Sequence, residues 1–199
     1  MPGERTKYAW RREILATRAA LGPAEHAREA SALAAAAALL AGADEVVCAY
    51  VPTRGEPGDL RMLDALRERG ATVLLPVTGA PGPLSWARYA GADSLRRARY
   101  GLLEPTTETL PPATVADAAT ILVPALAVDR RGVRLGRGAG YYDRTLGAAD
   151  ADARLIAVVR DAELVAELPE EPHDRRMGWA LTPGAGLGEL GDSPARAAE

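Results

Sequence analysis

Short apolar runs recur along the chain and are separated by stretches in which apolar and polar residues alternate at helical spacing. Four of the runs are typical of buried strands, and they cover residues 45–51, 71–77, 120–128 and 155–159. Pro124 interrupts the third run. A weaker alternation over 84–90 indicates a half-exposed strand, and 179–181 is predicted to form a last short strand.

The stretches between these runs predict helices. Trp10, Ile14 and Leu21 recur at helical spacing, with arginine and glutamate between them. The pair Gly22-Pro23 ends this helix, and the proline suits the first turn of an alanine-rich helix that follows. The predicted helices cover residues 4–21, 23–41, 60–69, 141–146 and 162–167.

Strands that alternate with helices imply a mostly parallel sheet with helices on both faces. The sequence therefore predicts an α/β fold, an open Rossmann-like three-layer sandwich, in a single domain over residues 1–183. Residues 184–199, rich in glycine, alanine and acids, are expected to be a frayed tail. Ligands of such sheets bind at the carboxyl ends of strands, so the segments after 51 and after 128 should face one crevice.

Composition narrows the class of protein. The 199 residues carry a net charge of −3, without the basic excess of a general nucleic-acid binder. No uncharged apolar run is long enough to cross a bilayer, and no apolar signal-peptide core is found. We therefore expect a cytoplasmic protein that binds neither nucleic acid nor membrane. A monomer is favoured, but the sequence leaves the oligomeric state open. Cys48 lies in an apolar run and is expected to be a buried, inert thiol.

The segment from Arg134 to Arg144, which reads Arg-Leu-Gly-Arg-Gly-Ala-Gly-Tyr-Tyr-Asp-Arg, carries the clearest chemistry. Its glycines allow positive φ angles and let an anion approach the backbone N–H groups. Arg134 and Arg137 add forked positive charge that matches phosphate oxygens, and Asp143 is suited to Mg²⁺ beside phosphates. The spacing is neither a Walker A loop nor the dinucleotide-binding Gly-x-Gly-x-x-Gly. The loop predicts a polyphosphate and metal site, although such turns also arise for steric reasons alone.

Lys7 is the single lysine among 24 basic residues, and the other 23 are arginines. In a chain so biased toward arginine, a retained lysine is a candidate for a site that needs a compact ammonium group, such as a tight phosphate pocket. The alternative is that one lysine survived by chance.

These features occur together in a known family. Segments 122–129 and 132–144 closely resemble the signature of the 5-formyltetrahydrofolate cyclo-ligases, also called methenyltetrahydrofolate synthetases. Weaker similarities follow in the family's order: Lys7-x-x-Trp10-Arg11, Tyr50-Val-Pro with Glu56, Leu84-x-Trp86 with Tyr89, Gly101-Leu-Leu-Glu-Pro105, Leu168-Pro169, His173-Asp174 and Thr182-Pro183. The resemblance spans about residues 7–183.

The resemblance implies an enzyme, a ligase that closes a C–N ring bond. It would convert 5-formyltetrahydrofolate into 5,10-methenyltetrahydrofolate with ATP and Mg²⁺, releasing ADP and phosphate. The formyl oxygen would attack the γ-phosphate, and N10 would then close on the activated carbon as phosphate leaves. Positioning and charge stabilisation dominate such phosphoryl transfer.

The same resemblance assigns roles to residues of this chain. Arg137 and Tyr141 would be catalytic. ATP would be bound by Lys7, Arg11, Arg134, Leu135, Gly136, Arg137, Gly138, Ala139, Gly140, Tyr141 and Tyr142. The folate would be bound by Val51, Glu56, Trp86, Arg137 and Tyr141, with Glu56 accepting from the N–H donors of the pterin. Asp143 and Asp174 would hold Mg²⁺. Trp86 either stacks on a flat ring or belongs to the core, and His173 is interpreted as a loop residue.

Some positions depart from the family's pattern or leave alternatives open. Ala139 stands where the family often has glycine or lysine, which removes a possible charge, and Pro57-Gly58-Asp59 replaces an acid–threonine pattern. Arg96, Arg97 and Arg99 are interpreted as a solvated face in preference to a site for a polyglutamate tail. Two other functions remain possible: a non-catalytic folate-binding protein, or another phosphate-ligand enzyme on the same fold.

Overall fold

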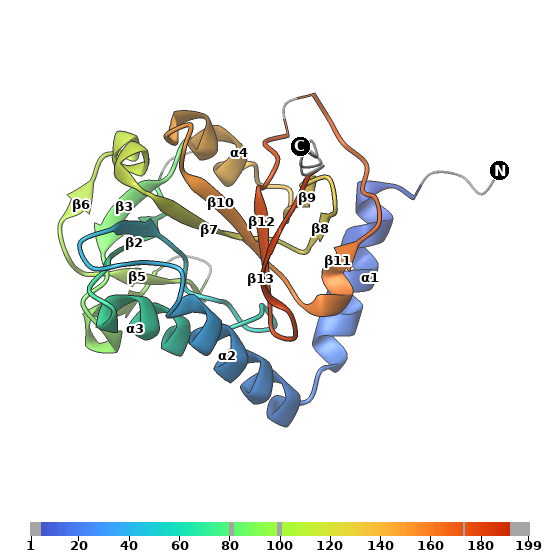
Figure 1. Ribbon diagram of the computed structural model, residues 1–199, viewed down its shortest axis with the longest axis horizontal. Helices are drawn as coiled ribbons and strands as arrows, with labels where there is room; N and C mark the ends of the chain where they lie inside the picture. The colour runs from blue at the N-terminus through green and yellow to red at the C-terminus, as the bar shows by residue number, and fades with distance from the viewer. Residues whose placement is uncertain (1–4, 80–81, 99–100, 173, 192–199) are drawn as a thin grey trace, which may run out of the picture.

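The computed structural model describes residues 5–79, 82–98, 101–172 and 174–191 (Figure 1). Eight strands form the main sheet: β1 (Val46–Cys48), β2 (Thr72–Val77), β3 (Ser85–Arg88), β6 (Thr109–Leu110), β7 (Thr120–Pro124), β10 (Arg154–Val158), β12 (Trp179–Thr182) and β13 (Gly186–Glu189). Their order is β13-β12-β10-β7-β1-β2-β3-β6. The five inner strands, from β12 to β2, are parallel, and β13, β3 and β6 pair antiparallel at the edges. The prediction of a mostly parallel sheet is confirmed.

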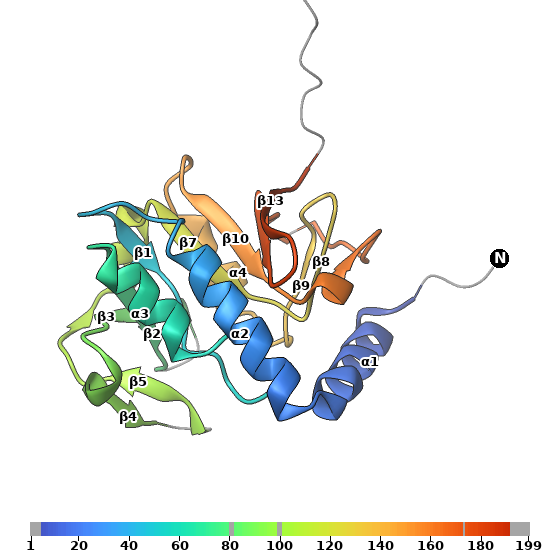
Figure 2. The ribbon, with the colours of Figure 1, turned by 60° about the horizontal axis from the view of Figure 1, so that its bottom comes forward.

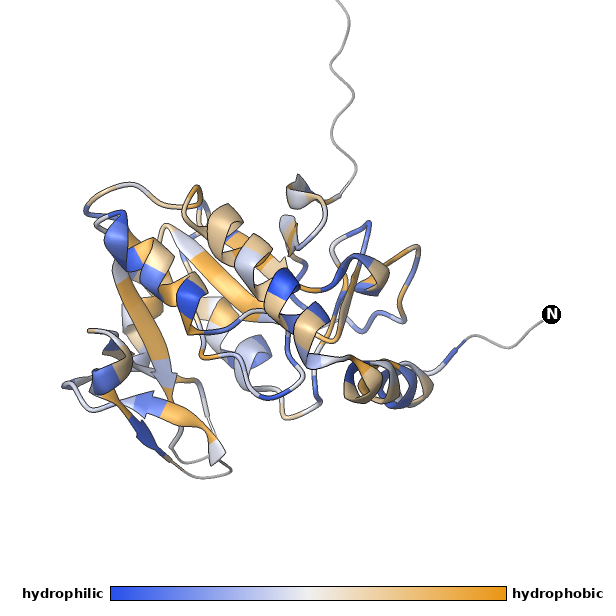
Figure 3. Ribbon diagram, turned by 90° about the horizontal axis from the view of Figure 1, so that it is seen from below, coloured by the Kyte–Doolittle hydropathy of each residue, from blue (hydrophilic) through white to orange (hydrophobic). Residues whose placement is uncertain are grey.

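Helices cover both faces of this sheet, as predicted. Helices α2 (Pro23–Ala37) and α3 (Leu60–Glu68) lie on one face (Figure 2). The opposite face packs against α4 (Tyr141–Thr145) and the 3₁₀ helices η3 (Pro112–Asp117) and η4 (Leu146–Ala148). Because side chains alternate along a strand, neighbouring residues of β1 enter different cores: Val47 packs with Leu33 and Leu63, and Cys48 with Val115. Figure 3 colours the ribbon by hydropathy: strands of the main sheet are largely orange, or hydrophobic, whereas the helices that cover the sheet also carry blue, hydrophilic residues.

A smaller unit lies beside the main sheet and supports the N-terminal helix. Helix α1 (Lys7–Ala20) begins where the Thr6 side chain accepts a hydrogen bond from the backbone N–H of Ala9. Its Ile14 packs on a three-stranded sheet of β11 (Leu164–Val165), β8 (Ala127–Asp129) and β9 (Arg134–Leu135). The apolar face predicted for this helix therefore has a partner, and α1 lies alongside the strand that leads into the glycine loop.

Two strand predictions need correction, one in the extent of the strand and one in its burial. The predicted strand 120–128 is two strands, β7 and β8, in different sheets, because Pro124 has no N–H group to continue the ladder. The predicted half-exposed strand near 84–90 is β3, but its Trp86 and Ala87 are fully buried because β6 pairs beyond it and η3 packs on it. A hairpin of β4 (Leu95–Arg97) and β5 (Leu103–Pro105), with η1 (Ala92–Ser94) before it, was not predicted.

Two predictions in the C-terminal part are wrong. The predicted helix at 162–167 is the 3₁₀ helix η5 (Asp161–Glu163) followed by β11. The frayed tail was predicted to begin at residue 184, but residues 186–189 form β13, which pairs antiparallel with β12 along its whole length. The single-domain organisation over residues 1–183 stays a prediction. Within the part of the chain that the structure describes, every helix is too short or too polar to span a bilayer.

Gly132 lies in the turn between β8 and β9, with φ at +89°. A Cβ atom there would come within 2.2 Å of the Met177 carbonyl oxygen. We expect Gly132→Ala to lower the free energy of unfolding by at least about 2 kcal/mol, from positive-φ strain together with the clash. Chemical denaturation measures the change. Gly147→Ala, where a Cβ atom meets open space, is the control, and an equal loss in both variants would contradict the prediction.

Candidate active site

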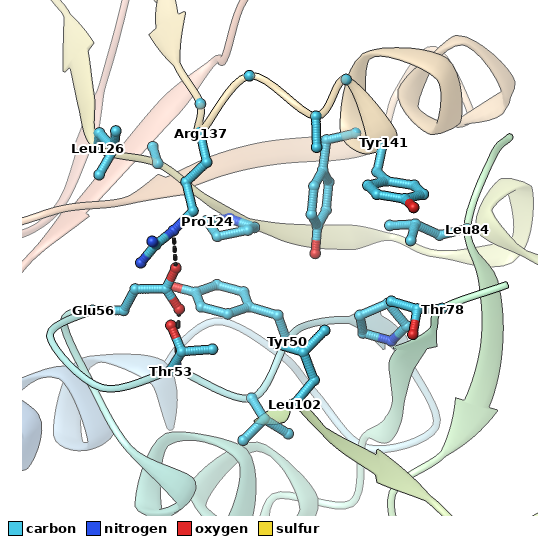
Figure 4. A pocket seen from close by; sticks show the side chains of 18 of the residues that line it. Tyr50, Thr53, Glu56, Thr78, Leu84, Leu102, Pro124, Leu126, Arg137 and Tyr141 are labelled. Atoms are coloured by element: carbon cyan, nitrogen blue, oxygen red, sulfur yellow. Dashed lines mark hydrogen bonds and ion pairs between the residues drawn. The ribbon is translucent and has the colours of Figure 1, made fainter. Parts of the chain in front are cut away.

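The main sheet has a switch point between β1 and β7. The chain passes from β1 to β2 on one side, whereas β7 lies on the other side of β1. The carboxyl ends of neighbouring strands at such a point open a crevice where ligands bind. A cavity of about 260 Å³ lies there, lined by segments that follow β1, β2, β7 and β9, by the start of α4 and by β5 (Figure 4).

Most of the cavity wall is apolar, and its polar groups are concentrated at a few places. Val51, Leu84, Leu102 and Leu126 come from four different segments. An apolar slot with few polar groups is typical of sites for flat organic ligands. The volume is below the ~300–1,000 Å³ common for such sites. A large ligand would therefore have to extend beyond the cavity, along the glycine loop.

Glu56 and Arg137 form the polar end of the cavity. The carboxylate of Glu56 is buried, and its Oε1 lies 3.2 Å from Nε of Arg137 (Figure 4). Its Oε2 accepts a hydrogen bond of 2.8 Å from the backbone N–H of Thr53. Half of the Arg137 side chain remains exposed, so it reaches from Glu56 toward solvent. The sequence assigned both residues to folate binding, and the structure brings them together.

The glycines of the loop make room for arginine side chains. Gly136 lies against Arg134, because a Cβ atom there would meet Nη1 of Arg134 at 2.8 Å. Gly138 and Gly140 have φ angles of +98° and +69°, which glycine adopts without strain. A Cβ atom on Gly140 would also meet Nη1 of Arg144 at 2.9 Å. The loop thus needs glycine both for its backbone path and for the guanidinium groups around it.

The arginines around the loop are of two kinds. Arg134 is buried, with Nη2 2.7 Å from Oδ1 of Asp143, and it also donates to the Pro124 carbonyl. Arg11 and Arg144 donate to backbone carbonyl oxygens of the loop, at Gly136 and Ala139, each at 2.9 Å. Carbonyl groups carry no net charge, and neither arginine has an acidic partner within the described residues. The loop therefore keeps an excess of positive charge that suits an anion.

Lys7 and Asp174, predicted for ATP and Mg²⁺ binding, lie in contact. Nζ of Lys7 lies 2.9 Å from Oδ2 of Asp174 and 2.8 Å from Oε2 of Glu171. Burial lowers the pKa of Lys7, but the hydrogen bonds to Glu171 and Asp174 outweigh burial and hold this pKa above its ordinary value. Lys7 lies one helical turn before Arg11 on α1, and Arg11 reaches the glycine loop through the Gly136 carbonyl.

The predicted metal ligands Asp143 and Asp174 each pair with a cation, Arg134 and Lys7 respectively. Among the described residues, no three acidic, histidine or cysteine side chains converge on one point. A protein-only metal cage is therefore not found in this part of the chain. Mg²⁺ commonly takes one or two carboxylates and completes its shell with substrate phosphates and water. A single carboxylate beside the loop fits that mode. His173 lies outside the described residues.

Two residues assigned to ligands, Trp86 and Leu135, have side chains that pack in hydrophobic cores, and a third, Tyr142, has a buried hydroxyl. Trp86 is fully buried in the core and does not line the cavity, so the core interpretation holds and a stacking role is contradicted. Leu135 packs with Ile14 in the small core, so its side chain supports the start of the loop, and its part in nucleotide binding stays a prediction. Tyr142 lines the cavity, but its hydroxyl is buried, and burial raises its pKa well above the ordinary value.

The structure also bears on the predictions for Cys48 and for the arginine cluster at residues 96–99. Cys48 is fully buried, and burial together with the nearby charge of Asp117 raises its pKa to about 12, so the thiol is inert as expected. Arg96 and Arg97 lie exposed on β4, and Arg99 lies outside the described residues.

Several cavity residues were not assigned to a ligand from the sequence. Tyr50 lies two residues after β1, and Pro124 ends β7, so the rule for strand ends could have found both. Thr78 follows β2, Glu104 lies in β5, and the two side chains hold each other: both the backbone N–H and the hydroxyl of Thr78 donate to Oε1 of Glu104. Glu104 belongs to the segment 101–105 that resembles the family, but that resemblance gave it no role, and the β4–β5 hairpin that brings it to Thr78 was not predicted.

A buried ionic network lies beneath the cavity and ties its walls together. Glu163 accepts from Nε and Nη2 of Arg18, at 2.7 and 2.8 Å, and from the backbone N–H of Arg160. Arg18 also donates to the carbonyl of Ala125, and Arg160 to the carbonyl of Gly55. The network therefore fixes the two loops that follow β7 and β1.

Comparisons with known proteins identify the family and the fold. The sequence matches the model of the 5-formyltetrahydrofolate cyclo-ligase family over residues 4–183. It is 49% identical to a 5-formyltetrahydrofolate cyclo-ligase of Mycolicibacterium smegmatis over 92% of this chain and 96% of that protein. The fold matches the structure of 5,10-methenyltetrahydrofolate synthetase from Aquifex aeolicus with a TM-score of 0.78 and 26% identity, over 97% of this chain and 96% of that one. The corresponding synthetase from Mycoplasma pneumoniae, 19% identical with a TM-score of 0.69 over 87% and 96% of the chains, shares the fold.

We expect Glu163→Gln to lower the free energy of unfolding by about 3 kcal/mol, because it leaves the guanidinium groups of Arg18 and Arg160 buried without their shared anion. Urea denaturation, with an unchanged dependence on denaturant, measures the loss. Glu170→Gln removes an exposed partner of Arg176 and should leave stability close to that of the wild type. Equal effects of the two substitutions would show that the network contributes no more than a surface pair.

Proposed function

Since the chain belongs to the 5-formyltetrahydrofolate cyclo-ligase family, we propose that this enzyme converts 5-formyltetrahydrofolate into 5,10-methenyltetrahydrofolate with ATP and Mg²⁺, releasing ADP and phosphate. The observation that carries the proposal is the position of Arg137. It belongs to the cationic glycine loop and contacts the buried carboxylate at the end of an apolar cavity. One side chain thus joins a site suited to phosphate with a site suited to a flat, polar-edged ring.

The cavity supports folate binding through two complementary surfaces. Its apolar wall, including Val51, suits the face of the pterin ring. Glu56 suits the polar edge, because a carboxylate accepts hydrogen bonds and the pterin presents adjacent N–H donors there. The remainder of the folate would leave the cavity past Arg137 and Tyr141, where its formyl group would meet the loop.

The loop and α1 support binding of the ATP phosphates. Arg11 and Arg144 lie against the loop without acidic partners in the described chain. Arg144 reaches the carbonyl of Ala139, so it can supply the positive charge that a lysine at that position supplies in other family members. Lys7 would exchange its pairing with Asp174 for a phosphate oxygen. The bound metal ion would be held by Asp143, and by Asp174 once Lys7 has turned away; it neutralises charge on the phosphates.

The proposed reaction proceeds in two displacements. The formyl oxygen forms a bond to the γ-phosphorus as the bond to ADP breaks, which turns a poor leaving group into phosphate. N10 then attacks the formyl carbon, N10 loses its proton, and the carbon–oxygen bond breaks to release phosphate. Arg137 would stabilise charge on the oxygens being transferred, and Tyr141 would hold the formyl group in line. Such a mechanism depends on position and charge, which the loop supplies.

The direct test follows absorbance of 5-formyltetrahydrofolate with the protein and Mg²⁺, with and without ATP. ATP-dependent appearance of the methenyl chromophore supports the proposal. If folded protein binds the folate in calorimetry but produces no chromophore, the non-catalytic binding function replaces it.

We expect Lys7→Arg to raise the KM for ATP roughly 5- to 10-fold, with little change in the KM for the folate. Charge is kept, but a planar guanidinium cannot replace a compact ammonium held between two carboxylates. Steady-state kinetics with each substrate varied in turn separates the two effects. Arg12→Lys, at an exposed position of the same helix, is the control. Unchanged kinetics of Lys7→Arg would remove this lysine from the nucleotide site.

We expect Asp143→Asn to raise the Mg²⁺ concentration for half-maximal activity at least about tenfold, because a neutral amide is a poorer ligand for Mg²⁺ than a carboxylate. A titration of activity against Mg²⁺ at saturating ATP measures the shift. Arg134→Lys weakens the same ion pair but keeps the carboxylate, so its half-activating concentration should stay near that of the wild type. A shift of equal size in both variants would assign the effect to the ion pair.

A further inference from the structure

Tyr50 lines the cavity, and its hydroxyl has no hydrogen-bond partner within the described residues. Tyr50 is only 4% exposed and lines the cavity at the end of β1. Its phenolic oxygen is buried and finds no donor or acceptor among the described residues, and Nη1 of Arg18 is in the same condition. Buried polar groups without partners destabilise a folded protein and are rare, so each one calls for a physical reason.

The absence of a partner is not a general property of buried tyrosines in this chain. Tyr89 is 1% exposed, and its hydroxyl donates a hydrogen bond of 2.9 Å to Oδ1 of Asp64. Tyr89 does not line the cavity in the described structure. Tyr142 lines the same cavity as Tyr50, and its hydroxyl is also buried without a partner in the described chain. Among these three tyrosines, the hydroxyl is therefore satisfied in the residue away from the cavity and unsatisfied in the two residues that line it.

The surroundings of Tyr50 specify what it could bind. In Figure 4 the hydroxyl end of its ring points toward the carboxylate of Glu56. Both oxygens of that carboxylate already accept hydrogen bonds, from Arg137 and from the backbone of Thr53. Burial and the negative charge of Glu56 raise the pKa of Tyr50 well above its ordinary value, so the hydroxyl keeps its proton. Tyr50 is therefore a neutral donor beside a carboxylate acceptor.

A pterin ring presents the complementary pair on one edge. Its amino and ring N–H groups are donors, and the adjacent ring carbonyl is an acceptor. A carboxylate alone satisfies the donors and would leave that carbonyl buried without a partner, which costs affinity. A site with a donor next to the carboxylate satisfies the whole edge.

We propose that Tyr50 is a specificity-determining residue whose hydroxyl donates a hydrogen bond to the ring carbonyl of the bound pterin, beside the N–H groups that Glu56 accepts. This inference rests on the proposed function and identifies the edge of the folate that the cavity recognises. The hydroxyl remains unpartnered in the protein alone because its acceptor belongs to the substrate. The unsatisfied hydroxyl makes the free protein somewhat less stable, but it lets the site distinguish a carbonyl from other substituents at that ring position.

The test uses Tyr50→Phe, which removes one oxygen and keeps the ring. We expect calorimetry without ATP to show 5-formyltetrahydrofolate binding weakened about 3- to 10-fold. The melting temperature should stay the same or rise, because an unsatisfied group is removed. Tyr89→Phe is the matched control: it should lower the melting temperature by about 2–4 °C and leave binding unchanged. Unchanged binding in Tyr50→Phe would mean that the hydroxyl meets only water, and would overturn the proposal.

A second measurement excludes a merely structural effect. An analogue of the folate in which an amino group replaces the ring carbonyl is titrated into the wild type and into Tyr50→Phe. The wild type should prefer the carbonyl form by a ratio that falls about 3- to 10-fold in the variant. An equal ratio in both proteins would overturn the proposal even if both ligands bind the variant more weakly.

Binding and turnover separate this inference from the proposed function. Wild-type protein that binds the folate but makes no methenyl product contradicts the proposed reaction, and the two titrations still decide the role of Tyr50. Wild-type protein that makes product while Tyr50→Phe binds normally contradicts only the role of Tyr50. Wild-type protein that binds no folate contradicts both.

Discussion

The buried guanidinium group of Arg134 is the interaction on which the site depends. A charge that is removed from water must be paired, and Asp143 and the Pro124 carbonyl supply its partners. These three residues belong to β9, to α4 and to the end of β7, so one side chain joins the two sheets and the helix. The loop between Arg134 and Asp143 is thereby closed at both ends. Gly136 lies beside it, and a Cβ atom there would come within 2.8 Å of Nη1, so any side chain at this position would shift the guanidinium group.

Other charged side chains of the site are also paired with opposite charges, although they are less buried than Arg134. Three of the cations expected to meet a phosphate are held by a carboxylate expected to meet a metal ion or the folate: Lys7 by Asp174, Arg134 by Asp143 and Arg137 by Glu56. The fourth, Arg11, is held by the carbonyl oxygen of Gly136. Pairing keeps the side chains extended in place before any ligand arrives. Ligand binding then exchanges partners among groups that are already positioned, which lowers the entropy lost on binding.

The sequence predicted those parts of the structure that are determined locally. Buried parallel strands appear as continuous apolar runs, so β1, β2, β7 and β10 were found, and the glycine loop was found from its composition. Edge strands such as β13 and the two-residue strands β9 and β11 depend on pairing with distant segments, which leaves little trace in local composition. Contacts between residues far apart in the sequence could not be predicted either: Arg18 and Glu163 are separated by 145 residues, and neither belongs to a motif. Trp86 illustrates the converse error, because an aromatic residue near a motif is buried by tertiary packing that the motif does not specify.

The unsatisfied polar atoms of this protein are not scattered. Within the described residues they belong to Arg18, Tyr50, Trp86, Arg134 and Tyr142. Tyr50, Arg134 and Tyr142 line the cavity, and Arg18 donates to the carbonyl of Ala125, which also lines it. Only Trp86 lies apart, in the core of the sheet. Buried polar groups without partners destabilise a fold, and a ligand that supplies their partners offsets this cost on binding. Tyr50, Arg134 and Tyr142 line one cavity, so a ligand bound there is the one most able to compensate them.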